Sequence, residues 1–391
     1  MNYILFDEAV VREHLLPFTF TRPVSEIRIG IMTIREKWEN ISGKKISVVT
    51  EKYLADKYPL SLSAQEDNIW INGSVLPTNE LFACIQSLKR NEGIKSGDAL
   101  IALNTGAQLL EGYTGERIYR EWEGNPIVQI KHLWDIFSLN GEAMELDFQQ
   151  LTKGRKSAKV SETNTLLGSN IFIEEGAKME CVVLNSTTGP IYIGKNTEIM
   201  EGSIIRGPFA LCEGAGIKAG AKIYGPTTVG PHSKVGGEVS NSVIFGYSNK
   251  GHDGFLGNSV IGEWCNLGAD TNTSNLKNNY STVDIYDHST RKMVSTGLTF
   301  CGLMMGDHSK CGINTMFNTG TVVGVCANIF GGDFPPKFIP SFSWGGAAGF
   351  TVYQIDKAFE TAERVFERRH KTFDETEKEI LRKVFALTVN S

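Results

Sequence analysis

The sequence lacks long apolar runs and an excess of positive charge. No stretch of about 18 consecutive apolar residues occurs, as a membrane-spanning helix requires, and the opening MNYILFDEAVV has no basic segment ahead of an apolar one. We therefore expect a cytoplasmic protein without a membrane span. The 39 lysines and arginines are outnumbered by 44 aspartates and glutamates, so the composition provides no positive field for binding nucleic acid or an anionic membrane.

Paired cysteines are also missing. The seven cysteines are an odd number, and no two of them have the CxxC spacing. This argues against a disulfide framework and against a cysteine zinc site. We expect most of them to be small buried side chains. The seven are Cys84, Cys181, Cys212, Cys265, Cys301, Cys311 and Cys326.

Glycine, by contrast, is abundant. The chain of 391 residues holds 41 glycines, about one residue in ten against a usual fraction of about 7%. A chain of this length also exceeds the roughly 250 to 300 residues at which a single core stops growing, so we expect two domains. The glycine excess requires a structural cause.

A six-residue repeat in the second half supplies that cause. A helix would need apolar spacings of three and four, and a strand a spacing of two. A spacing of six fits one short strand plus a corner, and three such units close one coil of a solenoid whose inward aliphatic side chains stack. Glycines then serve the corners. The repeat consists of Ile193, Ile199, Ile205, Leu211, Ile217, Ile223, Val229 and Val235.

After Val235 the phase of the repeat shifts by two residues, with Asn249 as an exception. The inward positions expected in the new phase are Val243, Phe255, Ile261 and Leu267 and, after an irregular segment, Met305, Cys311, Phe317, Val323 and Ile329.

This pattern resembles the hexapeptide-repeat family of left-handed parallel β-helices. The resemblance implies a left-handed coil over residues 156–337 and a homotrimer of acyltransferase subunits with active sites between neighbouring prisms. Association is also physically reasonable, because a flat wall with exposed aliphatic side chains is easily buried against a second copy.

The first half alternates strand and helix patterns and predicts an α/β domain over residues 1–155 with a mostly parallel sheet. Strands are expected at residues 2–7, 45–51, 68–74 and 99–104, and helices at 26–41 and 78–91. Residues 338–391 leave the repeat and become helical. There, apolar residues from Tyr353 to Phe366 recur at spacings of three and four, which predicts a helix that packs on the end of the β-helix or on a partner subunit.

The opening, ILFDEAVVREHLLPFTFTRPV, resembles the start of sugar-phosphate nucleotidyltransferases. The resemblance implies a truncated domain in which Arg12 is the loop arginine and Arg22 takes the place of a phosphate-binding lysine. The glycines that cradle a triphosphate are absent. In WINGSVLP, Ser74 occupies the position of the aspartate that holds Mg²⁺. Binding of UTP and Mg²⁺ is therefore expected only if this domain is active.

Residues 251–277, GHDGFLGNSVIGEWCNLGADTNTSNLK, contain the most specific pattern in the chain. They resemble the acetyltransferase domain of the bifunctional N-acetylglucosamine-1-phosphate uridyltransferase / glucosamine-1-phosphate N-acetyltransferase family, and the whole chain is similar to a compact group of that family. The resemblance implies that His252 is the general base and that Asn266 binds the sugar amine or the thioester region. Asn275 would bind substrate or coenzyme, and the backbone N–H groups of Ile313 and Gly331 would hold the coenzyme arm.

Three departures from the family pattern affect phosphate recognition. Phe255 and Leu276 stand in place of tyrosines, and Ser240 stands in place of a lysine. The missing cation would come from another lysine, for which Lys250, Lys277 and Lys218 are the candidates.

Residues 276–300 interrupt the repeat and predict a loop that protrudes from one corner, where it would serve the binding face of the protein or of a neighbour. Asp284, Asp287 and His288 lie close together in this loop. A solvated polar loop is favoured over a metal site, and no metal ligands are assigned.

The favoured function is an acetyl-CoA-dependent N-acetyltransferase that acts on an amino-sugar 1-phosphate, here glucosamine-1-phosphate, within nucleotide-sugar biosynthesis for the cell wall. Its chemistry requires a base with a pKa near 7, which a histidine supplies. Two alternatives remain open. One is nucleotidyl transfer from UTP to a sugar phosphate at the first domain, and the other is a non-catalytic trimer that binds a sugar nucleotide.

Overall fold

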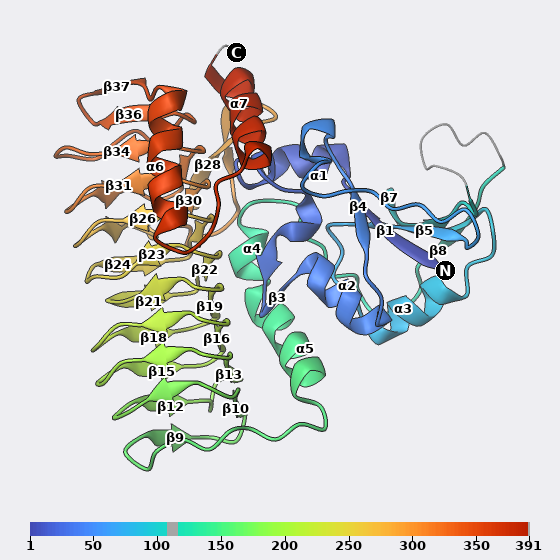
Figure 1. Cartoon of the computed structure of the whole chain (residues 1–391), viewed down its shortest axis with the longest axis horizontal. Coiled ribbons are helices and arrows are strands. Elements are labelled where there is room, and N and C mark those ends of the chain that lie inside the picture. The colour runs from blue at the N-terminus through green and yellow to red at the C-terminus, as the bar shows by residue number, and fades with distance from the viewer. Residues whose placement is uncertain (108–115, 390–391) are drawn as a thin grey trace. The chain divides into compact units, whose positions relative to one another are not determined.

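The computed structural model describes residues 1–107 and 116–389, and the chain divides into two compact units (Figure 1). Unit 1 comprises residues 1–15, 21–27 and 32–131, and unit 2 comprises residues 16–20, 28–31 and 132–391. Residues 132–155, which the sequence assigns to the first domain, thus cluster with the second unit. No described helix is both long enough and apolar enough to cross a membrane.

Unit 1 is built on a six-stranded sheet of order β4-β1-β5-β7-β6-β8. The pairs β1–β4, β1–β5 and β6–β8 are parallel, whereas β5–β7 and β6–β7 are antiparallel, so the predicted mostly parallel α/β sheet is confirmed. The strands are β1 (Asn2–Phe6), β4 (Ser47–Val49), β5 (Asn68–Asn72), β6 (Glu92–Ser96), β7 (Ala99–Asn104) and β8 (Ile118–Glu121), with the short β3 (Met32–Thr33) outside the sheet. The helices are α1 (Ala9–His14), α2 (Ile34–Ser42) and α3 (Asn79–Gln86), with single turns η2 (Val24–Glu26) and η3 (Lys52–Leu54).

The helix predicted at residues 26–41 begins eight residues later than expected, at Ile34. Thr33 caps it, because its Oγ1 accepts a hydrogen bond from the backbone N–H of Glu36 at 3.2 Å, and the Glu36 carboxylate accepts one from the N–H of Thr33 at 2.7 Å. This reciprocal capping box defines the start of the helix. The apolar pattern upstream of Thr33 belongs to short turns and extended segments instead.

Unit 2 is a β-helix with three flat walls, each a sheet of parallel strands stacked along the axis (Figure 1). Wall 1 contains β10 (Ile171–Ile173), β13 (Ile191–Ile193), β16 (Phe209–Leu211), β19 (Thr227–Val229), β22 (Val243–Ile244), β25 (Val260–Ile261), β30 (Leu303–Met305), β33 (Thr321–Val323) and β35 (Phe338–Ile339).

Wall 2 contains β11 (Lys178–Met179), β14 (Glu198–Ile199), β17 (Gly216–Ile217), β20 (Lys234–Val235), β23 (Asn249–Lys250), β26 (Asn266–Leu267), β31 (Lys310–Cys311), β34 (Asn328–Ile329) and β36 (Ser343–Gly346), and it ends with the antiparallel β37 (Gly349–Val352). Wall 3 contains β9 (Thr165–Leu167), β12 (Val183–Asn185), β15 (Ile204–Arg206), β18 (Lys222–Tyr224), β21 (Glu238–Ser240) and β24 (Phe255–Gly257), followed by the pair β27 (Asn272–Thr273) and β32 (Met316–Phe317). The predicted parallel β-helix of short stacked strands is confirmed.

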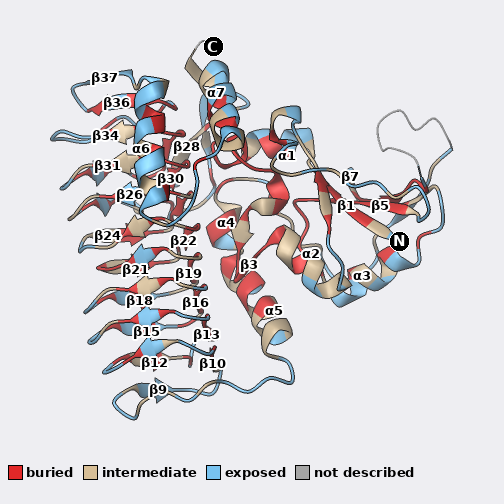
Figure 2. Cartoon of the chain, viewed as in Figure 1, coloured by how far each residue is buried: buried red, intermediate tan, exposed pale blue. Residues whose placement is uncertain are grey.

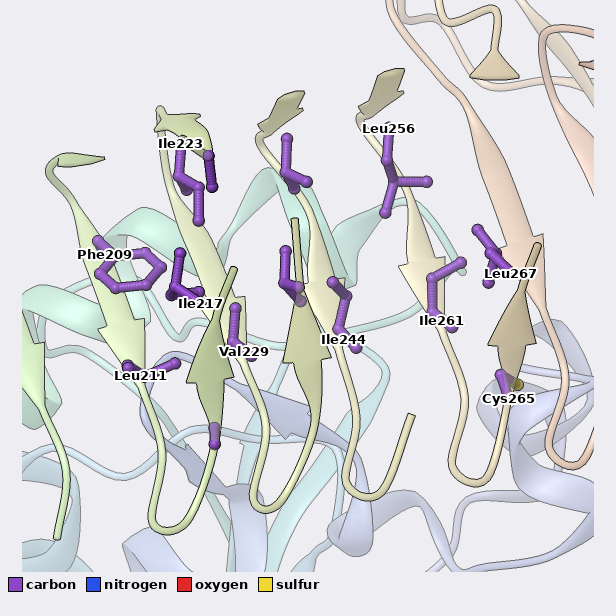
Figure 3. Packing of buried hydrophobic residues seen from close by; sticks show 14 of the residues in the cluster. Phe209, Leu211, Ile217, Ile223, Val229, Ile244, Leu256, Ile261, Cys265 and Leu267 are labelled. Carbon is purple, nitrogen blue, oxygen red and sulfur yellow. The ribbon is translucent and has the colours of Figure 1, made fainter. Parts of the chain in front are cut away.

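The aliphatic repeat forms the core of unit 2. All eight residues from Ile193 to Val235 that recur at a spacing of six are at most 2% exposed, and they join one continuous hydrophobic cluster. Figure 3 shows Leu211, Ile217 and Ile223 pointing into the space between the walls. Five of the seven cysteines are buried, as expected for small apolar side chains, whereas Cys84 is half-buried and Cys181 is exposed.

Beyond Val235 the predicted phase is wrong by one residue over the next coil. Ile223 pairs with Val239, a spacing of 16, and Val229 pairs with Ile244, a spacing of 15, whereas the preceding coil pairs Leu211 with Val229, a spacing of 18. The phase therefore moves by three residues (18 − 15 = 3). The inward residues in this coil are Val239, Ile244, Lys250 and Leu256 instead of Val243, Asn249 and Phe255.

Val243 is nevertheless buried, because the outer face of wall 1 is covered by other parts of unit 2. This cover consists of α4 (Asp135–Ser138), α5 (Asn140–Thr152), the turn η1 (Phe18–Phe20) and β2 (Arg28–Ile29). Met144 of α5 packs with Ala210 of wall 1, and Thr228 Oγ1 donates a hydrogen bond to Gly30 O at 2.7 Å. Figure 2 shows α5 with buried residues along its length, whereas β15 and β18 of wall 3 carry exposed residues.

The segment 276–300 also lies on wall 1, so the prediction of a protruding loop is wrong. It forms the hairpin β28 (Asp284–Asp287) and β29 (Lys292–Ser295), and the Tyr286 ring stacks on Phe338 of wall 1 with centroids 3.6 Å apart. Lys277 Nζ donates to Thr282 O at 2.6 Å, and its ammonium is 3.4 Å from the Asp284 carboxylate. The stacking of Tyr286 on Phe338 therefore holds the hairpin against wall 1 of its own chain. In the described part of the chain no group of three metal-binding side chains occurs.

The predicted C-terminal helix is α6 (Ile355–Glu367), followed by α7 (Glu375–Val389). It packs on the corner between walls 1 and 2 of the same chain, where Phe366 stacks on Trp264 at a centroid distance of 3.9 Å. Trp264 lies in a column of rings at this corner, since Tyr247 stacks on it at 4.2 Å and His232 stacks on Tyr247 at 4.9 Å.

Candidate active site

The corner between walls 2 and 3, called here the active corner, carries the predicted base. Residues 251–254 link β23 to β24 and form the His252 turn. His252 and Asp253 are both exposed, and within the described residues the imidazole has no hydrogen bond. The turn therefore presents an unengaged imidazole to solvent, as a general base requires.

The His252 turn is held tightly between the corners of the adjacent coils. On one side lies Gly237, whose φ is +73° and where a Cβ would be 2.9 Å from both the Asp253 Cα and the His252 O. On the other side the backbone N–H of Asp270 donates to Asp253 O at 3.1 Å. The turn therefore has little freedom to move along the axis of the β-helix.

Lys250 lies directly before this turn, but its position differs from the one that phosphate binding requires. Its side chain points into the β-helix and is 2% exposed. Nζ donates to His252 O at 2.5 Å and to Asp253 O at 3.2 Å. Burial lowers the pKa of Lys250 to about 8, against the opposing effect of the Asp253 and Asp270 carboxylates. The ammonium thus faces backbone carbonyls instead of a substrate.

Asn266 lies on the outer face of wall 2, one coil from Asn249, and is exposed. The Asn249 side chain links it to the C-terminal helices. Arg369 Nη2 donates to Asn249 Oδ1 at 3.0 Å, and Asn249 Nδ2 lies 3.5 Å from Asn266 Oδ1. From the sequence, Arg369 is one of three arginines that either reach a coenzyme phosphate or lie on a solvated helix face, and its contact with Asn249 is not indicated, since 120 residues separate the two in the chain.

Asn275 and Phe255 meet on the outer face of wall 3. A Cβ on Gly257 would lie 2.5 Å from the Phe255 ring and 2.6 Å from Asn275 Nδ2, so both side chains cover this glycine. Asn275 Nδ2 also donates to Asn258 Oδ1 at 2.8 Å. Phe255 thus begins β24 at the active corner, whereas Asn275 bonds Asn258 beyond the other end of β24, across wall 3 from the His252 turn.

The two residues expected to hold the coenzyme arm follow the same corner. Ile313 is 69% exposed and lies two coils from the His252 turn, and Gly331 lies one coil further. With about 4.8 Å between parallel strands, the strip from His252 to Gly331 is about 14 Å long. Its far end is apolar, because Phe330 and Trp344 are 43% and 41% exposed with ring centroids 5.3 Å apart.

In unit 1, Arg12 and Arg22 are both buried, at 7% and 3% exposure. Arg12 Nη1 forms an ion pair with Asp7 Oδ2 at 3.0 Å and donates to Arg22 O at 3.1 Å, while Nη2 donates to Tyr53 Oη at 3.2 Å. The backbone N–H of Val24 donates to the other Asp7 oxygen at 2.8 Å. The loop arginine that the resemblance assigns to phosphate is thus occupied by the protein's own carboxylate.

The surroundings of Ser74 do not fit a magnesium ion. Ser74 is 1% exposed, and its hydroxyl donates to Asn72 Oδ1 at 2.6 Å and accepts from Gln129 Nε2 at 2.8 Å. Asn72 Nδ2 in turn donates to the Glu8 carboxylate at 2.9 Å. The oxygen atoms that would coordinate Mg²⁺ are therefore committed to hydrogen bonds within the protein, and a serine replaces the anionic ligand.

The fold and the site together define a two-unit protein in which an α/β sheet precedes a hexapeptide β-helix. Residues 3–156 match the family model described as sugar nucleotidyl transferase. The chain is 29% identical over 205 residues to the bifunctional protein GlmU of Methanococcus maripaludis (strain C5), covering 50% of this chain and 41% of GlmU. It is 30% identical over 146 residues to the bifunctional sugar-1-phosphate nucleotidylyltransferase/acetyltransferase of Sulfurisphaera tokodaii, covering 37% of this chain and 36% of that protein.

A third relative is the uncharacterized acetyltransferase YaiX of Escherichia coli O6:K15:H31, with 27% identity over 144 residues, 36% of this chain and 62% of YaiX. The chain thus covers less than two thirds of the length of these curated relatives. Among solved structures, the UDP-N-acetylglucosamine acyltransferase of Francisella novicida aligns with a TM-score of 0.25 and 16% identity over 56% of this chain and 74% of that one. The chain is thus similar in sequence to GlmU-like sugar nucleotidyltransferase/acetyltransferases, which agrees with the resemblance.

Proposed function

We propose that the protein is an N-acetyltransferase that moves the acetyl group of acetyl-CoA to the amine of an amino-sugar 1-phosphate, with glucosamine-1-phosphate as the first substrate to test. The observation that carries the proposal is the exposed, unengaged imidazole of His252 on a closely held turn. The names of the Sulfurisphaera tokodaii and YaiX relatives, both of which include acetyltransferase, agree with acetyl transfer.

The chemistry follows from the position of the imidazole. His252 accepts a proton from the sugar ammonium or from the amine as its nitrogen attacks the thioester carbon. The carbon–sulfur bond then breaks, and the coenzyme A thiolate takes the proton from the imidazolium as it leaves. A neutral imidazole is required at the start, and histidine is the side chain that can be both neutral and basic near neutral pH. Asn266 and Asn275 are the amide groups on the two flanking walls that would orient sugar and acetyl group.

The sugar phosphate requires a cation, and Lys218 is the remaining candidate. It lies at the active corner one coil before Gly236 and Gly237, and its side chain is half-buried. Lys250 is buried beneath the His252 turn and Lys277 is engaged in the hairpin. Within the described residues no hydrogen bond or ion pair of the Lys218 ammonium occurs. We therefore assign phosphate binding to Lys218.

A homotrimer is part of the proposal, and wall 1 does not take part in it. Because α5, β28 and β29 already cover the outer face of wall 1, contacts between subunits must use walls 2 and 3. Wall 3 offers exposed apolar side chains, with Ile204 at 53% and Tyr224 at 40% exposure. Such contacts would place a second subunit beside the active corner, where Ile313 and Gly331 hold the coenzyme arm.

The direct test is thiol release from acetyl-CoA in the presence of glucosamine-1-phosphate. His252→Asn is expected to lower kcat by about 100-fold or more, because general base catalysis typically contributes about 10²–10⁴-fold. His370→Asn is the matched control, since His370 is also exposed but lies after α6, away from the active corner. Equal turnover in both variants would show that His252 is not the base.

A second candidate is nucleotidyl transfer at unit 1, which the sugar nucleotidyl transferase match over residues 3–156 favours. The ion pair of Arg12 with Asp7 and the hydroxyl at Ser74 argue against it. Pyrophosphate release from UTP and N-acetylglucosamine-1-phosphate, measured with and without Mg²⁺, separates the two. If both assays are negative while these ligands still raise the melting temperature, the protein is a non-catalytic binding trimer.

A further inference from the structure

The interior of wall 2 contains one residue that does not belong to an aliphatic core. The inward residues along this wall include Ile217, Val235, Leu267 and Ile329, all at most 2% exposed. Lys250 pairs with Val235 and takes the same inward position at 2% exposure. Burial of an ammonium group costs several kcal/mol unless hydrogen bonds and opposite charges compensate. A lysine in this column therefore needs a local reason.

The contacts of Lys250 show what compensates this cost. Its Nζ reaches forward to the carbonyl oxygens of His252 and Asp253, at 2.5 Å and 3.2 Å. The charged and titratable groups around it are Asp253 on the same turn, Asp270 on the next corner and the Cys311 thiol on β31. The ammonium is thus bonded to the same two peptide groups that carry the exposed side chains of the His252 turn.

We propose that Lys250 is a positioning residue for His252. Its ammonium binds the two carbonyls of the His252 turn from inside the β-helix and so holds the turn in the conformation that directs the imidazole outward. The proposal rests on the proposed function, because it assigns Lys250 a part in the chemistry of His252. It excludes direct contact between Lys250 and substrate, since the side chain is buried.

One consequence concerns the pH dependence of this contact. Since burial lowers the pKa of Lys250 to about 8, the side chain loses its proton as the pH rises through about 8. The charge-assisted hydrogen bonds to the two carbonyls are therefore fully present only well below that pH.

The test uses the full-length chain with Lys250→Met, because methionine fits an aliphatic column and has neither charge nor donor. Lys178→Met is the matched control, since Lys178 is an exposed lysine on the outer face of the same wall, in β11. The readout is hydrogen exchange of the Asp270 amide by NMR, because this amide donates to Asp253 O, one of the two carbonyls that Lys250 binds. We expect this amide to exchange about tenfold faster in Lys250→Met and at an unchanged rate in Lys178→Met.

Acetyl transfer provides a second readout. In Lys250→Met, kcat is expected to fall about tenfold with little change in the KM for the sugar, because a displaced imidazole affects the chemical step more than binding. If the unaltered chain shows no acetyl transfer, the proposed function fails, but the exchange of the Asp270 amide still decides whether Lys250 holds the His252 turn.

A loss of folding is handled with Lys250→Gln, which retains a neutral donor for one carbonyl. This variant should retain part of the amide protection and of the kcat that Lys250→Met loses. Unchanged amide exchange in folded Lys250→Met, or no recovery in folded Lys250→Gln, overturns the proposal. If neither variant folds, Lys250 serves the stability of the β-helix and the proposal is equally overturned.

Discussion

The close packing around the His252 turn leads to a specific prediction for Gly237. Its φ of +73° disfavours alanine, and a Cβ there would lie 2.9 Å from the Asp253 Cα and from the His252 and Gly254 carbonyl oxygens. These are backbone atoms, so the contact is relieved only if the turn moves. Gly237→Ala therefore perturbs the site without touching a catalytic side chain.

Gly220 is the control, because it lies at the same corner in the preceding coil, has a φ of +70°, and a Cβ added there would have no atom within 4 Å. Gly220→Ala carries only the conformational cost, about 1 kcal/mol of unfolding free energy. Gly237→Ala adds overpacking, which typically costs about 1–3 kcal/mol, for a total of about 2–4 kcal/mol. The difference between the variants isolates the contact with the His252 turn.

Both variants are compared by chemical denaturation of the β-helix and by acetyl transfer. We expect Gly237→Ala to unfold at lower denaturant concentration than Gly220→Ala and to lose kcat about tenfold or more, since a displacement of the turn moves the imidazole. Gly220→Ala should retain its activity. If the two variants have the same midpoint and the same turnover, the turn is not held by this contact and the geometry argued for His252 is incorrect.

Two further predictions concern the C-terminal helices and the hairpin. Arg369→Met removes the donor to Asn249, and because Asn249 contacts Asn266, it should lower kcat/KM for acetyl transfer about tenfold, the equivalent of about 1.4 kcal/mol. Arg368→Met, at an exposed neighbouring position, should leave kcat/KM unchanged. Equal kinetics in the two variants would contradict the link from Arg369 to Asn266. Burial lowers the pKa of His288 from 6.5 to about 4, so the folded protein binds this proton less readily than the unfolded chain. The contribution of His288 to the free energy of unfolding should therefore be constant above pH 6.5 and fall by up to about 3 kcal/mol between pH 6.5 and 4. Denaturation across this range should show a smaller loss in His288→Leu, and an identical loss would contradict the assignment.

The architecture of unit 2 was readable from the sequence because its core is strictly periodic. Each short strand from Ile193 to Val235 contributes one inward aliphatic side chain, so the spacing of six residues in the sequence corresponds to one wall of the coil. The His252 turn was predictable for a related reason, since the motif around it is contiguous. The alternation in the first half was equally sufficient for the α/β sheet of unit 1.

The sequence alone led to wrong assignments where a residue or segment is buried by contacts other than those in the core of the β-helix. Val243 looked like a core position, yet it is buried under the cover of wall 1, and Ile244 points inward instead. The hairpin at 276–300 is polar in sequence, but the stacking of Tyr286 on Phe338 holds it on its own chain. The start of α2 at Ile34 was predicted eight residues too early, because it depends on capping by the polar side chain of Thr33 and the prediction used only the apolar pattern.

By itself, then, the sequence determined the coil, the sheet and the residue type at the active corner, because these depend on local periodicity and on one contiguous motif. The tertiary structure decided which side of each strand faces inward after the shortened corner, and so placed Lys250 beneath the His252 turn. It alone joined Arg369 to Asn249, because residues 120 positions apart meet only when α6 packs on the corner of the β-helix. Such contacts depend on the summed geometry of many coils and corners, which no local pattern contains.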